Sequence, residues 1–272
     1  MLDPATQARL VWACLAIAIT ARTVRFLLKF PLWEDECFLA ANFIDRGYGD
    51  LLAPLNYHQV APLLFLGIEL TCVKLFGFAE WPLRLFPFLC SIGSLLLFRR
   101  LAGRLLEGLP LVLAVAAFSL NYSGIRYAAE AKPYGPDQFV SLALLSLAIE
   151  AWRRPDERRW IWLLAAVAPL AIGLSYPAVF MAGGISLALA FVLWTSGDRR
   201  GWIAWTAYNA ALVGSFALLL LLARNQADAE LGYMQNYWKD NLPSLASPLR
   251  FAGWLIVTHT SELMSFPVGG ER

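Results

Sequence analysis

Long apolar runs follow one another along most of the chain, separated by short polar stretches. Seven of them reach the length that a helix needs to cross the hydrocarbon core of a bilayer, about 17–25 residues. They lie near residues 10–30, 82–101, 109–125, 136–152, 160–176, 177–195 and 201–223. This pattern predicts an all-α integral membrane protein with about seven transmembrane helices.

An eighth apolar run, 62–78, is interrupted by Glu69 and Lys74. Positive charge gives an independent test of whether it crosses, because Lys and Arg concentrate in cytoplasmic loops. If the run does not cross, the arginine clusters at 99–104, 153–159 and 199–200 all face the cytoplasm. We therefore expect 62–78 to lie along the outer surface as a juxtamembrane or re-entrant helix. The polar stretches 32–50 and 126–135 then face the outer compartment together.

Composition agrees with a membrane protein, since 59% of the residues are hydrophobic and 15% are charged, with a mean hydropathy of +0.56. Membrane lipids are expected partners. The net charge of only +2, from charged residues scattered along the chain, does not indicate a nucleic-acid partner. The four cysteines lack CxxC spacing, so neither a disulfide framework nor a zinc ribbon is expected. We expect a membrane module at 1–223, followed at 224–272 by an outer loop and a partial C-terminal segment.

Three consecutive carboxylates, Glu34, Asp35 and Glu36, directly follow the first apolar run. Partial desolvation beside a bilayer raises the basicity of a carboxylate, which suits a proton acceptor or a cation ligand. The alternative is structural, because acids also cap the N-terminus of a helix, here one expected at 37–45.

A second polar loop, 126–137, carries both signs of charge and two tyrosines. An interfacial anchor of Tyr and Lys explains such a loop on its own, but a shared face with the acidic stretch favours a site. His58 is expected beside the carboxylates, where it is either a hydrogen-bonded structural residue or a ligand.

Three cations, Arg22, Arg25 and Lys29, stand at the outer end of the first helix. They recur at helical spacing and so share a face. We expect them either to face an anionic ligand or to snorkel to the lipid headgroups.

These motifs, in this order, resemble those of a known family. They read Trp-Glu-Asp-Glu at 33–36, His-Gln-x-x-Pro-Leu at 58–63, Phe-Gly-x-x-Glu-x-x-x-Arg at 76–84 and Arg-Tyr-x-x-Glu-x-Lys-Pro-Tyr at 126–134. The set is similar to that of the GT-C glycosyltransferases of the dolichyl-phosphate-mannose protein mannosyltransferase class (family 39-like). Bacterial relatives include aminoarabinose and galacturonosyl transferases. The resemblance covers about residues 10–195.

The resemblance implies an inverting glycosyltransferase of the hexosyl or pentosyl class that serves the cell envelope. Its donor would be a sugar linked to a polyprenyl phosphate, and its acceptor a hydroxyl of a protein, a lipid or a glycan. It would lie in the cytoplasmic (inner) membrane with its active site on the outer, periplasmic face. The alternatives are a transporter or flippase, or a non-catalytic membrane subunit, that handles polyprenyl-linked glycans.

Carried over to this chain, the resemblance makes Asp35 the catalytic base and Glu36 its partner in the acidic pair. It places Arg126, Lys132 and Tyr134 at the donor phosphate. Some relatives bind a divalent metal, such as Mg²⁺, Mn²⁺ or Zn²⁺, and the matching residues here are Asp35, Glu130 and His58, with Gln59 as the alternative to His58. Asp137 competes with Glu130 as the second-loop acid. Val60-Ala61-Pro62 replaces the Pro-Pro of many relatives, which leaves the third metal ligand open.

Overall fold

The computed structural model describes residues 2–239, 243, 247–258 and 260. These residues form helices joined by loops and contain no strand, as the sequence predicts. The α-helices are α1 (Pro4–Leu27), α2 (Glu34–Ala40), α3 (Leu63–Phe76), α4 (Glu80–Leu105), α5 (Gly108–Ser119), α6 (Tyr122–Arg126), α7 (Tyr134–Arg153), α8 (Arg159–Leu174), α9 (Ala178–Ser196), α10 (Arg199–Leu222), α11 (Arg224–Trp238) and α12 (Pro248–Val257).

Each predicted span corresponds to an observed helix or helix pair within a few residues. Four helices, α1, α4, α9 and α10, are long and apolar enough to cross a membrane, and α5 with α6 forms a bent pair that brings the number to five. The count of seven is therefore not confirmed. The helix α8 has only 16 residues, and α7 carries Asp137 and Glu150 within its length.

The run predicted as one span at 109–125 is broken, with α5 and α6 meeting at an angle of 52°. Arg22 of α1 fills the break. Its Nη1 donates to the carbonyl of Ser119 at 2.8 Å and its Nε to Ser91 Oγ at 3.0 Å. A cation suits the C-terminal carbonyls of a helix. Arg22 is 1% exposed, so the expectation that it snorkels to the headgroups is wrong.

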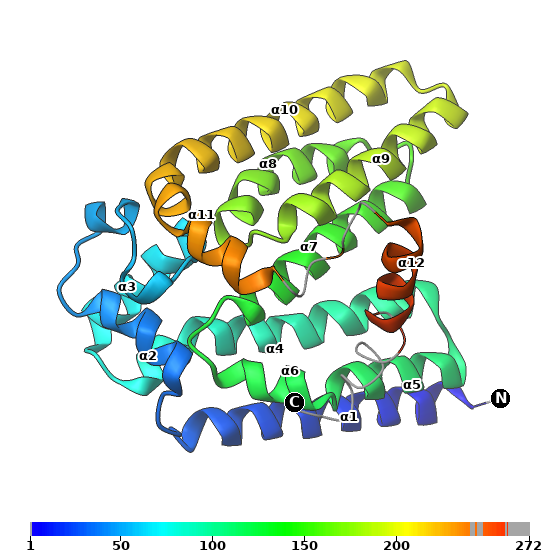
Figure 1. Cartoon of the computed structure of the whole chain (residues 1–272). Helices are drawn as coiled ribbons and strands as arrows, with labels where there is room; N and C mark the ends of the chain where they lie inside the picture. The colour runs from blue at the N-terminus through cyan, green and yellow to red at the C-terminus, as the bar shows by residue number, and fades with distance from the viewer. Residues whose placement is uncertain (1, 240–242, 244–246, 259, 261–272) are drawn as a thin grey trace.

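The arginine clusters lie at one end of the bundle, as the charge pattern predicts. Arg153 Nη1 donates to the carbonyl of Arg104 at 2.6 Å, and Arg104 pairs with Glu150 at 3.0 Å. Arg158 pairs with Asp198 of the α9–α10 turn at 2.9 Å. Figure 1 shows α2 and α3 together at the opposite end. The chain thus separates a cationic end from the end that carries the acidic loop.

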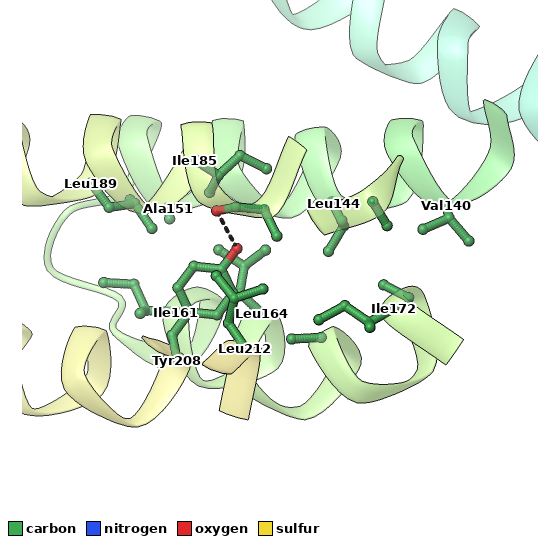
Figure 2. Packing of buried hydrophobic residues seen from close by; sticks show 14 of the residues in the cluster. Val140, Leu144, Ala151, Ile161, Leu164, Ile172, Ile185, Leu189, Tyr208 and Leu212 are labelled. Atoms are coloured by element: carbon green, nitrogen blue, oxygen red, sulfur yellow. Dashed lines mark hydrogen bonds between the residues drawn. The ribbon is translucent and has the colours of Figure 1, made fainter. Parts of the chain in front are cut away.

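The described residues contain three hydrophobic clusters, one of which packs α1 against α4 and α5. The larger of the other two joins α7, α8, α9 and α10 (Figure 2), and Tyr208 within it donates to the carbonyl of Ala182 at 2.9 Å. The second packs the first loop, residues 28–62 between α1 and α3, onto α3 and α4 through Leu39, Phe65 and Leu83. It also contains Ala131 of the second polar loop. Apolar packing therefore contributes to bringing both loops together.

The acidic stretch and the polar tail differ in detail from the expected elements. The short helix α2 begins at Glu34 rather than after the acids, so all three carboxylates lie in its first turn. The stretch after α10, expected as an outer loop, forms the helix α11. Gln226 of α11 donates to the carbonyl of Leu51 at 2.6 Å, which docks this helix on the first loop.

Candidate active site

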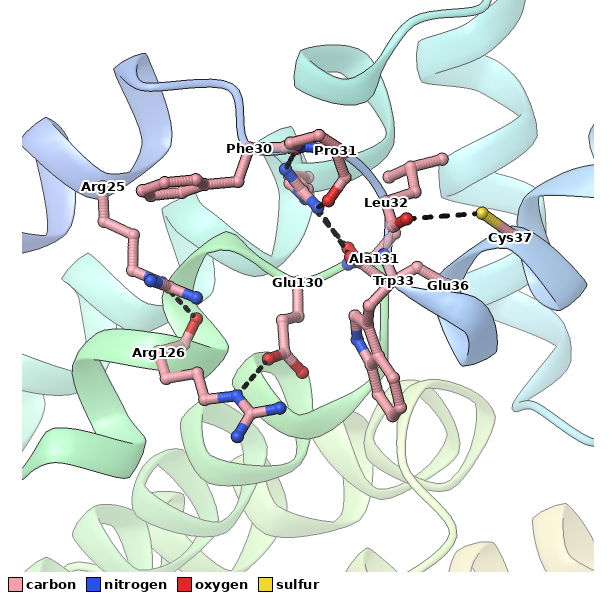
Figure 3. Close-up of polar contacts among 11 residues, drawn as sticks. Arg25, Phe30, Pro31, Leu32, Trp33, Glu36, Cys37, Arg126, Glu130 and Ala131 are labelled. Atoms are coloured by element: carbon pink, nitrogen blue, oxygen red, sulfur yellow. Dashed lines mark hydrogen bonds and ion pairs between the residues drawn. The ribbon is translucent and has the colours of Figure 1, made fainter. Parts of the chain in front are cut away.

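Glu36 joins the first loop to the second. Arg84 of α4 donates to it twice, from Nε to Oε1 at 2.8 Å and from Nη2 to Oε2 at 2.6 Å. The backbone N–H of Ala131 donates to Oε1 at 2.7 Å, and that of Trp33 to Oε2 at 3.2 Å. Figure 3 shows this junction. The two loops therefore meet at one end of the bundle, as the sequence predicts.

Glu36 is fully buried, with an exposed fraction of 0%. A buried carboxylate is tolerated only when a cation and further donors satisfy it, and a forked arginine does this best. Each of its two carboxylate oxygens already accepts two hydrogen bonds. Glu36 therefore fixes the two loops to each other and to α4.

Asp35 lies in a closed ring of contacts with Lys132 and Gln59. Lys132 Nζ is 2.8 Å from Asp35 Oδ2, and Gln59 Nε2 donates to Asp35 Oδ1 at 3.2 Å. Lys132 Nζ also donates to Gln59 Oε1 at 2.7 Å. The Asp35 side chain is 33% exposed, so an incoming hydroxyl can reach it, whereas neighbouring Glu34 is exposed and Glu36 sealed.

Lys132 is mostly buried, and burial lowers the pKa of its ammonium. Three carboxylates, those of Asp35, Glu36 and Glu130, oppose this effect and favour the charged form. Lys132 is therefore the cation at which the acids of both loops converge.

A pocket of about 210 Å³ lies on the other side of Glu36. Its walls include the three guanidinium groups of Arg25, Arg84 and Arg126 and the rings of Trp33 and Tyr122. Arg25 Nε donates to the carbonyl of Arg126 at 3.2 Å, which fixes α1 against the second loop. Cations beside aromatic faces suit a phosphorylated sugar.

Glu130 lines the same pocket and is 2% exposed. Its Oε1 accepts from Arg126 Nε at 2.8 Å, with the Trp33 ring beside them (Figure 3). Its Oε2 has no hydrogen-bond partner among the described residues. Burial raises the pKa of Glu130, against the lowering effect of Arg126. Glu130 can therefore orient the guanidinium and still has an oxygen available for a ligand.

The other second-loop residues are placed apart from this pocket. The Tyr134 ring contacts that of Tyr127 at a tilt, with ring centroids 4.7 Å apart. Asp137 lies in the first turn of α7 beside Ser175 and does not line this pocket. Glu130 rather than Asp137 thus shares a pocket with Glu36.

His58 does not join Asp35 and Glu130. Its Nδ1 lies 2.7 Å from Glu230 Oε2, and its ring stacks on Tyr233 with centroids 4.1 Å apart. In the part of the chain that the structure describes, no three His, Cys, Asp or Glu side chains are grouped to hold a metal ion. Asp35 and Glu130 each have a cationic partner instead. The residues present therefore do not fit the predicted metal set.

Sequence reasoning gave no role to Arg84 and none to Glu230. A signal for Arg84 was present, because a charged residue inside an apolar helix requires a buried counter-ion. No sequence pattern links Glu230 to His58, since these residues are far apart in the chain. The four cysteines are free.

Apolar helices of membrane-spanning length, with a polar pocket at one end of the bundle, define a multi-pass membrane protein. The sequence model of the dolichyl-phosphate-mannose-protein mannosyltransferase family matches residues 59–223. The chain belongs to this family and is a membrane glycosyltransferase of the GT-C type. The match includes Arg84, Glu130 and Lys132, whereas Asp35 and Glu36 precede it. Comparisons with curated proteins and with solved structures give no match.

Proposed function

We propose that the chain transfers a sugar from a polyprenyl-phosphate donor to an acceptor hydroxyl, with inversion at the anomeric carbon and with Asp35 as the base. The observation that carries this proposal is the position of Asp35, a partly exposed carboxylate held by Lys132 and Gln59. It stands next to Glu36, which forms a wall of the cationic pocket.

The chemistry requires one proton acceptor and a place for negative charge. The acceptor oxygen attacks the anomeric carbon from the face opposite the phosphate, and its proton passes to Asp35. The bond between the anomeric carbon and the phosphate oxygen breaks, and the phosphate leaves with the electron pair. Because this leaving group is already acidic, no second acid has to protonate it.

The charges of the site suit these roles. Arg25 and Arg126 line the pocket, and their guanidinium groups stabilise the departing phosphate. Arg84 already forms an ion pair with Glu36, so we assign it no role at the phosphate. Glu130 sets the orientation of Arg126 through its ion pair. Lys132 holds the Asp35 carboxylate in place through its ion pair, and Tyr134 follows Lys132 closely in the second loop.

A divalent cation bound through Asp35 and Glu130 is implied only by the family resemblance. The reaction as written does not pass through it, because Lys132, Arg25 and Arg126 supply positive charge from the chain itself.

The outer face of the cytoplasmic membrane is the proposed location of the site. The cationic end of the bundle, with Arg104, Arg153 and Arg158, faces the cytoplasm by the positive-inside rule, so the opposite end faces out. Cys37 tests this, because it is exposed beside Asp35. A membrane-impermeant maleimide should label it in intact spheroplasts, with Cys37→Ser as the control. Labelling only after permeabilisation would place the site inside.

The base is tested by turnover of Asp35→Asn in native membranes. The substrates are a panel of polyprenyl-phosphate hexoses and pentoses, with protein, lipid and glycan fractions as acceptors. Loss of a positioned base lowers the rate by about 10²–10⁴-fold. Glu34→Gln, one residue away and exposed, is the matched control and should retain its rate. Unchanged turnover of Asp35→Asn overturns the proposal.

A further inference from the structure

Helix α11 begins one residue after the family match ends at 223, yet it contributes buried polar contacts to the first loop. Gln226 is 0% and Glu230 6% exposed. Gln226 Nε2 donates to the carbonyl of Leu51, and Glu230 contacts His58. A polar helix that buries these side chains, while Asp228 between them stays exposed, is docked by one face.

The segment that α11 holds has an unusual backbone. Tyr57 and His58 have φ values of 61° and 55°, in the left-handed region that large side chains avoid. Such residues persist only where their surroundings fix them. Here the Tyr57 ring stacks on Phe38 of α2 at 5.1 Å. The His58 ring is held by Glu230 and Tyr233 of α11.

The next residue is Gln59, which contacts both polar partners at the proposed base. It donates to Asp35 Oδ1 and accepts from Lys132 Nζ. The dihedral angles of His58 set the direction in which the chain enters Gln59. A contact on the His58 side chain therefore reaches Asp35 through a single backbone step.

We propose that α11 is a clasp on the first loop, and that Glu230 is a positioning residue that acts through His58 and Gln59 on Asp35. The positioning role rests on the proposed function, because it takes Asp35 as the base; the clasp itself does not. When Glu230 releases His58, the strained turn relaxes and Gln59 leaves the ring. Asp35 then loses its alignment.

This arrangement predicts which kinetic constant changes. Among the described residues, none of those that line the cationic pocket belongs to α11, so we expect donor binding to stay the same. Loss of the clasp therefore lowers kcat and leaves the donor KM unchanged, which general unfolding would not do.

The kinetic arm uses the full chain in nanodiscs, with whichever polyprenyl-phosphate hexose or pentose the wild type turns over. Glu230→Ala should lower kcat by about tenfold, the scale of a small misplacement of a catalytic group. Glu230→Gln, whose amide still bonds to His58, should recover part of the rate. The double variant Glu230→Ala/His58→Ala should be no slower than His58→Ala alone, because His58→Ala already removes the contact with Glu230. Asp228→Ala, on the exposed face of the same helix, should retain the wild-type kcat.

The second arm needs no enzymatic activity. The helical amides of α11 are protected from hydrogen exchange while the helix is docked. His58→Ala should raise exchange in 226–238 several-fold over the wild type, while exchange in α9 stays the same. Unchanged exchange overturns the clasp, whether or not sugar transfer is ever detected. Faster exchange with unchanged kcat in Glu230→Ala overturns the positioning role alone.

Discussion

Lys132 Nζ lies 2.8 Å from Asp35 Oδ2 and so links the second polar loop directly to the first. The contact is short, part of a ring closed by Gln59, and formed by a lysine that is 9% exposed. The site thus depends on two loops, which the helices must place at the same end of the bundle and within contact of each other.

Replacing Lys132 should change the alkaline side of the pH–rate profile. Burial lowers the pKa of Lys132, so it loses its proton at a lower pH than a free lysine, and the rate should fall there. Lys132→Arg stays charged at every accessible pH. This variant should therefore keep its rate to a higher pH than the wild type. Lys132→Met should lower kcat at all pH values. The measurement is kcat against pH in nanodiscs; identical alkaline limbs in the wild type and Lys132→Arg would contradict it.

Replacing Glu130 separates stability from activity. Its pKa is raised by burial, so the folded state binds a proton more tightly than the unfolded state does. Its contribution to stability is thus present at acid pH and is lost as the pH rises through the raised value. Glu130→Gln removes this loss, and its thermal midpoint should depend less on pH than that of the wild type.

The same variant should transfer sugar more slowly, because Arg126 loses its partner. We expect kcat/KM for the donor to fall by about tenfold, as expected for one charge-assisted contact. Asp137→Asn, which lies outside the pocket, is the control. A variant with full activity would remove Glu130 from the site.

Breaking the Glu36–Arg84 pair should destabilise the chain strongly. Removal of one partner of a buried ion pair leaves an uncompensated charge and costs about 3–5 kcal/mol. Arg84→Met should therefore unfold at a much lower temperature in detergent. The double variant Arg84→Met/Glu36→Leu, with an apolar pair in the same space, should regain much of that stability. It should remain inactive, because the bond from Glu36 to the backbone of Ala131 is gone.

Gly135 controls how closely α7 approaches α4. A Cβ at this position would lie 2.7 Å from the backbone carbonyl oxygen of Pro87, which cannot swing away. Gly135→Ala should therefore destabilise by about 1–3 kcal/mol, as overpacking does. It should also lower activity, since α7 begins just after Lys132. Gly183→Ala in α9 has open space around the new methyl and should be neutral or stabilising by up to about 1 kcal/mol.

The sequence predicted the helices well because hydrophobic runs and charged ends are local properties. The run at 62–78 forms α3, and the arginine clusters share one end. The break between α5 and α6 was not predicted, although Asn121 caps α6 by accepting from the N–H of Gly124. Its further support comes from Arg22 of another helix, which the local sequence does not reveal.

The site was predicted in part. Both loops were expected on one face, and they meet through Glu36 and Ala131. The roles of Glu34, Asp35 and Glu36 depend on the direction in which α2 points each side chain, and the sequence alone does not give this direction. His58 contacts Glu230 of α11 rather than the carboxylates of the first loop. This contact was not predicted, because the segment that forms α11 was expected to be a loop.

The first helix contacts both the end of α5 and the start of the second polar loop. Arg22 binds the end of α5, and Arg25, nearly one turn further along, binds the carbonyl of Arg126. A tilt of α1 within the bilayer must then carry the guanidinium of Arg126 with it. Since helix tilt follows the thickness of the surrounding lipid, acyl chain length becomes a variable that acts on the pocket, and turnover in thin and thick bilayers should differ even with every substrate saturating.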